Sequence, residues 1–237
     1  MKRDRFFYTA AGAIFLALTF IGFRHYIFGG MHDDGTPIDP AMLATVIAHS
    51  SAIFAWFLFF FVQSLLISTQ NRRVHMKLGW GVLGIASAIA VTGPFVAVRS
   101  TRVYGTPVFD WPARPFLLVM FTEIALFVVF VTIGALNRKR PRIHRPMMLL
   151  ASLSLISGAT ARIPLIHSVF GYHEWMALFG PVVALGALFL LARWAMTRSL
   201  EREYAVGLAV LAAATLAASR LAETNVWVSW AGIILKP

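Results

Sequence analysis

Four histidines have positions that could bind the iron of a haem group within a helical membrane protein. His49 lies inside an apolar run and His167 near the end of another, whereas His75 and His144 each follow an arginine-rich turn. A b-type haem in a helix bundle is held by two histidines at matching depth on facing helices. The spacing predicts one pair on each side of the membrane, with His49 and His167 as the favoured pair. We therefore expect haem b and a role in electron transfer or redox sensing.

A second group of polar residues lies toward the side of the membrane where His49 and His167 are expected. Charged side chains inside a membrane are costly, by roughly 2.5–3.5 kcal/mol at a helix centre, and usually face protein or water. Four such residues are expected to share one polar cavity, with Glu123 pairing with Arg162 or Arg220; they are Glu123, Arg162, Arg220 and Glu223. A structural ion-pair network between helices explains the same residues equally well.

The same side chains also fit a different function. His49, His167 and Glu123 supply nitrogen and carboxylate ligands, which suit zinc, and three protein ligands leave a position for water. The alternative hypothesis is therefore a metal-dependent enzyme that acts on a lipid-like substrate at the outer face. A third hypothesis is a non-catalytic subunit of a larger membrane complex, with no cofactor, whose 20 Phe and 7 Trp contact partner helices or lipid.

Seven apolar runs must position these groups. Of the 237 residues, 59% are apolar and only 13% are charged, against roughly 25% charged in soluble domains. A membrane-spanning helix needs about 20 apolar residues, so the length allows seven spans in a single transmembrane domain over residues 1–237. The predicted helices cover about 6–23, 41–68, 77–97, 115–136, 146–168, 176–196 and 204–222. The last is rich in alanine, and the tail around Trp227 and Trp230 is typical of an interfacial segment.

The basic residues predict the orientation of this bundle. In a seven-span arrangement, fourteen of them fall on one side of the membrane: Lys2, Arg3, Arg5, Arg72, Arg73, Lys77, Arg138, Lys139, Arg140, Arg142, Arg145, Arg193, Arg198 and Arg202. The opposite loops carry the acidic residues Asp33, Asp34, Asp39, Asp110 and Glu174. Positively charged loops stay in the cytoplasm, so we expect a cytoplasmic N-terminus and an outer C-terminus. The net charge of +11 is thus an orientation signal, and nucleic acid binding is not expected.

Missing residues exclude several other classes. The chain has no cysteine, which excludes disulfides, iron–sulfur clusters and covalently attached haem. A retinal protein needs a lysine within a span, and Lys2, Lys77, Lys139 and Lys236 all lie outside the span interiors. The HExxH, Walker and GxSxG motifs are absent, as is the His-x-x-x-His of the seven-helix zinc hydrolases.

Three stretches resemble a family of bacterial multi-pass membrane proteins that has no established activity. They run from His49 to Gln63 (HSSAIFAWFLFFFVQ), from Arg72 to Gly79 (RRVHMKLG) and from Arg140 to Pro164 (RPRIHRPMMLLASLSLISGATARIP). The resemblance implies a multi-pass protein of the bacterial inner membrane. Its His-initiated second helix and two Arg-x-His-basic turns are distantly similar to dihaem b-type membrane cytochromes. Those cytochromes place one histidine on each of four helices, whereas here His144 and His167 flank the same predicted helix.

Overall fold

The computed structural model describes residues 6–32, 35–104 and 111–236, and these residues form helices without any β-strand. Lys2, Arg3, Arg5, Asp33, Asp34 and Asp110, which contributed to the predicted orientation, lie outside the described residues. The helices are α1 (Phe7–Gly22), α2 (Arg24–Gly29), α3 (Pro40–Ser68), α4 (Arg72–Tyr104), α5 (Ala113–Leu136), α6 (Pro141–Leu153), α7 (Ser157–Ala161), α8 (Pro164–Phe170), α9 (Glu174–Thr197), α10 (Arg202–Ala222) and α11 (Asn225–Ile234).

Six of the seven predicted spans each fall on one helix, 146–168 falls on the three helices α6, α7 and α8, and five helices are long and apolar enough to cross a membrane. These five are α3, α4, α5, α9 and α10. A sixth span is complete if α6 and α7 together with α8 count as one broken span. Helix α1 is apolar but has only 16 residues, which is just below the roughly 17–25 residues that a spanning helix uses. The protein is therefore a multi-pass helical membrane protein with five or six candidate spans.

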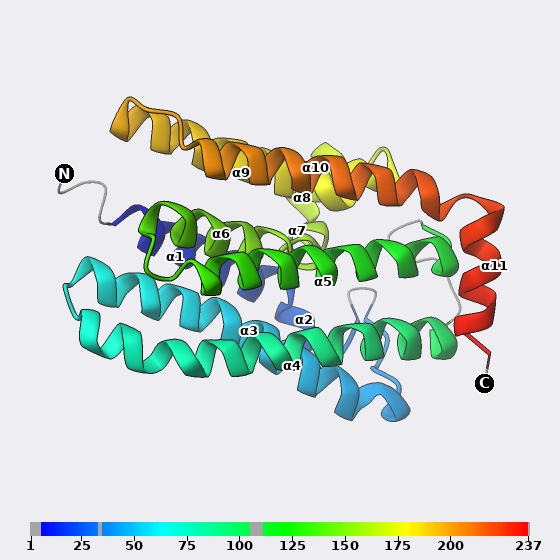
Figure 1. Cartoon of the computed structure of the whole chain (residues 1–237). Helices are drawn as coiled ribbons and strands as arrows, with labels where there is room; N and C mark the ends of the chain where they lie inside the picture. The colour runs from blue at the N-terminus through cyan, green and yellow to red at the C-terminus, as the bar shows by residue number, and fades with distance from the viewer. Residues whose placement is uncertain (1–5, 33–34, 105–110, 237) are drawn as a thin grey trace.

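The long helices run back and forth along one direction, so their turns gather at two ends (Figure 1). The turns that join α3 to α4, α5 to α6 and α9 to α10 lie at the same end as the start of α1. We call this the basic end, because the chain carries Arg72, Arg138, Arg140, Arg198 and Arg202 at these turns. The grouping follows from the antiparallel connections and agrees with the charge pattern of the sequence.

The predicted span 146–168 is not one straight helix. Helix α6 ends at Leu153, α7 is a single short helix, and α8 is bent by 97° from the segment before it. Pro164 opens α8, and the residue before it, Ile163, has an extended backbone with φ −92° and ψ 113°. This is expected, because proline disfavours the helical conformation in the residue that precedes it. Arg162 and His167 therefore do not continue the axis of α6.

Helix α1 packs closely on this broken segment. A Cβ atom at Gly22 would lie 2.2 Å from the backbone oxygen of Ala159 in α7, so only glycine permits the observed approach. Further along α1, Phe15 is fully buried against the rings of Phe57, Phe60 and Phe189. These contacts place α1 inside the bundle beside α3 and α7.

The aromatic core continues below the basic end. Trp56 of α3 is 1% exposed, its ring centre lies 4.7 Å from that of Phe127, and its indole nitrogen donates to Ser152 of α6 at 3.1 Å. A buried Trp N–H needs such a partner. Through Trp56, these contacts hold α3, α5 and α6 together.

The tail predicted to be interfacial forms α11 at the opposite end from the basic end (Figure 1). The indole nitrogen of Trp227 donates to the backbone oxygen of Arg114 at 2.8 Å, and Arg102 donates to the backbone oxygens of Ile234 and Lys236. Helix α11 thus ties the last long helix to α4 and α5.

Candidate cofactor site at the basic end

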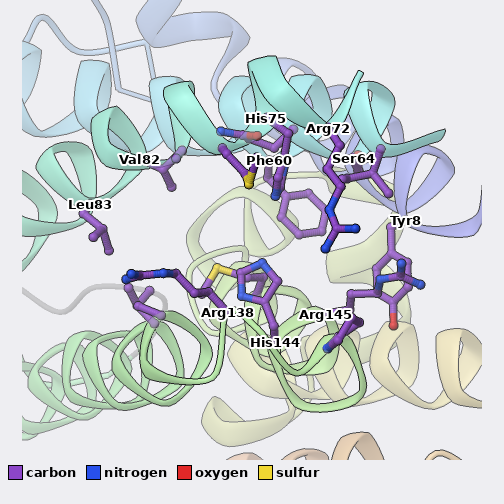
Figure 2. Close-up of a pocket in the computed structure, with 18 of the residues that line it drawn as sticks. Tyr8, Phe60, Ser64, Arg72, His75, Val82, Leu83, Arg138, His144 and Arg145 are labelled. Atoms are coloured by element: carbon purple, nitrogen blue, oxygen red, sulfur yellow. The ribbon is translucent and has the colours of Figure 1, made fainter. Parts of the chain in front are cut away.

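Short turns bring His75 and His144 together. His75 is the fourth residue of α4 and His144 is the fourth residue of α6, and both helices start at the basic end. Their ring centres lie 6.5 Å apart and the ring planes are inclined by 82°. Of the four histidines considered from the sequence, these two lie close together, edge to face, in the wall of one cavity (Figure 2).

The tautomer of His144 is determined by a backbone partner. Its Nδ1 lies 2.9 Å from the backbone oxygen of Gly134 in α5. A carbonyl oxygen only accepts hydrogen bonds, so Nδ1 carries the proton and Nε2 keeps a free lone pair. Metal-binding histidines are commonly oriented in this way, with the other ring nitrogen donating to a carbonyl or carboxylate.

His75 has an adjustable partner in Gln63 of α3. In the amide orientation that suits its neighbours, Gln63 donates to His75 Nδ1 at 2.5 Å and accepts from the backbone nitrogen of Gly79 at 3.1 Å. This leaves the proton of the free imidazole on Nε2. A free Nε2 lone pair on His75 requires the proton to move to Nδ1, and the Gln63 amide must then rotate and give up its hydrogen bond from the Gly79 nitrogen.

The two histidines line a cavity of about 920 Å³ between α1, α3, α4, α5 and α6. Its deeper wall is apolar and includes Trp56, Phe60, Val82, Val131 and Met148. Small-molecule and cofactor sites are typically of this size, about 300–1,000 Å³, with mostly apolar walls and a few placed polar groups. Gly79 lines the wall one helical turn after His75, and a Cβ atom there would meet no heavy atom within 4 Å.

The mouth of this cavity is cationic. Arg72, Arg138, Lys139 and Arg145 line it, and no Asp or Glu is among the described lining residues. Figure 2 shows Arg72 and Arg145 on one side of the histidine pair, with Arg138 on the side of Val82 and Leu83. The guanidinium of Arg138 lies 5.5 Å from the ring centre of Trp80. An apolar interior below a basic mouth suits an amphipathic anion.

The favoured pair from the sequence, His49 and His167, has other surroundings. His49 Nδ1 lies 2.9 Å from the hydroxyl of Thr92 in α4. His167 lies in α8, beyond the 97° bend. Its ring packs against Gly171, where an added Cβ atom would lie only 2.8 Å from His167 Nε2. Neither residue lines the cavity at the basic end.

The expected polar cavity around Glu123 takes a different form. Glu123 accepts a hydrogen bond from the hydroxyl of Ser157 in α7, and within the described ranges it forms no salt bridge with Arg162 or Arg220. Arg162 instead stacks over Phe23 and Tyr26, at 4.9 and 5.4 Å from their ring centres. The physical reason is the break after α6, which presents the Ser157 hydroxyl to Glu123 and turns Arg162 toward α1 and α2.

Arg220 and Glu223 are exposed at the end of α10. Within the described residues, no three His, Asp or Glu side chains gather in a way that could hold a metal ion. The zinc site of His49, His167 and Glu123 stays a prediction without geometric support here.

Two features of the site were not anticipated from the sequence. Gln63 appears in the sequence only as the last residue of a resembling stretch, and its spacing from His49 does not predict a contact with His75. Gly79 likewise appears in the sequence only as the last residue of such a stretch, and its place in the cavity wall depends on which helices are neighbours. No family model, curated relative or solved structure matches the chain.

Proposed function

We propose that the protein is a multi-pass membrane protein that binds one b-type haem between His75 and His144 and exchanges electrons through it. The observation that carries the proposal is the 6.5 Å separation of the two imidazole centres across the cavity. An imidazole nitrogen binds a metal at about 2 Å and lies about 1 Å from its own ring centre. If His75 and His144 each bound one iron through a ring nitrogen, their ring centres would lie about 6 Å apart, close to the separation observed.

The surroundings support a porphyrin at this place. Trp56, Phe60 and Met148 offer apolar surface for the macrocycle, and the Gly79 position leaves the space beside His75 free. The absence of cysteine means that the haem is held without covalent attachment. When bound, the iron supplies one-electron chemistry, and the protein holds it through two nitrogen ligands and excludes water with the aromatic wall.

The membrane arrangement belongs to the same proposal. The basic end faces the cytoplasm of a bacterial cell under the positive-inside rule, and the chain crosses the inner membrane seven times, with α1 and the α6–α8 segment counted as spans. This orientation puts the histidine pair close to the cytoplasmic face, where soluble electron donors are available. A larger complex with other membrane subunits is compatible with this arrangement.

Absorption spectra of ligand variants test the proposal. Protein purified after expression with ample haem supply is expected to show the Soret and alpha bands of a six-coordinate b-type haem in reduced-minus-oxidised spectra. His75→Ala and His144→Ala are each expected to lose the six-coordinate spectrum, because each removes one axial ligand. His49→Ala and His167→Ala are the matched controls and should retain it.

Each alternative result has a definite meaning. Loss of the bands in the His49 and His167 variants alone would assign the haem to the pair favoured by the sequence. Absence of haem bands from the unmodified protein would refute the proposal as a whole. Less than one zinc ion per chain, measured in the same preparations, would count against the metal-enzyme alternative.

A further inference from the structure

The cationic residues at the mouth of the cavity are not explained by iron ligation. Arg72 opens α4, and Arg145 follows His144 in α6. Both line the cavity, and both interact electrostatically with His75. Within the described part of the chain, neither forms a salt bridge or a side-chain hydrogen bond. Two exposed guanidinium groups without a partner among the described residues therefore line the same opening, where they are available to bind an anionic ligand.

An acidic group close to Tyr8, Glu201, is already paired with another arginine. Tyr8, on the same side of the cavity, has both Arg145 and Glu201 as electrostatic neighbours. Glu201, however, is bound by Arg193 at 2.5 Å, and Arg193 is 6% exposed, so its charge is already balanced in a separate buried pair. Figure 2 shows Arg72 and Arg145 on the Tyr8 side of the histidine pair.

We propose that Arg72 and Arg145 form a carboxylate-binding site at the mouth of this cavity. Guanidinium groups bind carboxylates, as they bind phosphates, with two parallel hydrogen bonds. A ligand with an apolar body and carboxylates at one edge fits the apolar wall and this site together. The porphyrin of haem b has this chemistry, so the inference rests on the proposed function for the identity of the ligand. The carboxylate chemistry itself is independent of iron.

Metal-free protoporphyrin IX separates carboxylate binding from iron ligation, because it has the carboxylates but no iron for His75 and His144 to bind. Its affinity for the purified protein in detergent is measured by quenching of tryptophan fluorescence, since Trp56 and Trp80 line the cavity. The dimethyl ester of the same porphyrin has an identical ring without the negative charges. The unmodified protein is expected to bind the diacid at least tenfold more tightly than the ester.

The double variant Arg72→Gln/Arg145→Gln is expected to lose most of this preference, while its affinity for the ester stays the same. The control is Arg73→Gln/Arg142→Gln, which removes the same total charge from the same two helices at positions outside the cavity wall. That control should retain the preference for the diacid. Equal preference in both double variants would overturn the site, as would a protein that binds the diacid and the ester equally or binds neither.

The outcome is distinguishable from failure of the proposed function. A protein that prefers the diacid but shows no haem bands keeps the carboxylate site and loses the haem assignment. A protein with haem bands that depend on His75 and His144, but without the diacid preference, keeps the haem and loses the carboxylate site. Displacement of the diacid by dodecanoate at concentrations below those of the porphyrin itself would overturn the porphyrin as ligand in favour of a fatty acid.

Discussion

A leucine at position 79 is expected to close the cavity without damage to the fold. Gly79 lines the cavity in α4, and a Cβ atom there would have no heavy atom within 4 Å. His75 lies one helical turn earlier, and side chains in a helix lean toward its N-terminus. The leucine of Gly79→Leu therefore projects over the His75 ring, into the space proposed for the porphyrin.

The expected magnitudes follow from these contacts. Glycine is about 0.8–1 kcal/mol less favourable than alanine in a helix and leucine ranks just below alanine, so the variant should be at least as stable as the unmodified protein. For a chain of this size the gain corresponds to a rise in Tm of about 2–4 °C. Haem affinity should fall at least tenfold, which is about 1.4 kcal/mol. Spectroscopic haem titration and thermal unfolding in one detergent measure both quantities.

Gly84→Leu is the matched control for this experiment. Gly84 lies in the same helix, also without a neighbour within 4 Å, but it does not line the cavity. Its variant should gain stability in the same way and bind haem with unchanged affinity. A Gly79→Leu protein with normal Tm and normal haem affinity would show that the porphyrin does not lie in this cavity.

Two further predictions concern the bundle that holds the site. Arg193→Ala should lower the free energy of unfolding by about 3–5 kcal/mol, because it leaves Glu201 without its buried partner. In thermal unfolding, the double variant Arg193→Leu/Glu201→Leu should recover much of this loss. An equally unstable double variant would contradict the pairing argument. Since the chain has no cysteine, Arg198→Cys and Glu223→Cys provide unique labels for an impermeant thiol reagent on intact inverted membrane vesicles. The first should react and the second should not, whereas the reverse pattern would invert the proposed orientation.

Most of the helical arrangement could be predicted from apolar runs and their boundaries. The predicted spans 41–68, 115–136, 176–196 and 204–222 agree with α3, α5, α9 and α10 to within a few residues. The third, 77–97, was predicted too short at both ends, because α4 continues through Arg72 and Arg73 at its start and through Arg99 and Arg102 at its end. The break in 146–168 was missed, since Ser154, Ser157 and Pro164 are individually tolerated in membrane helices and their joint effect depends on packing against α1.

The sequence predicted the type of the candidate site, a pair of histidines, but it did not predict which pair lies close together. Residue types indicated paired histidines, and the sequence placed His75 and His144 at one depth. Which pair is close depends on lateral contacts between helices, which hydropathy does not report. The α3–α4 and α5–α6 contacts bring Gln63 to His75 and Gly134 to His144. Glu123 accepts a hydrogen bond from Ser157, because the break after α6 brings that hydroxyl to the carboxyl group. The two arginines expected from charge alone do not reach it.

The depth of the histidine pair has an electrical consequence. His75 and His144 are each the fourth residue of a helix that begins at the basic end, about 4.5 Å of helix rise from its start. The hydrocarbon core is about 30 Å thick, so a charge carried from that end to a point between the rings crosses roughly a seventh of the transmembrane voltage. Its energy then changes by roughly 0.3 kcal/mol per 100 mV, compared with about 2.3 kcal/mol for the whole membrane. Electron exchange from this side would proceed almost independently of the membrane potential.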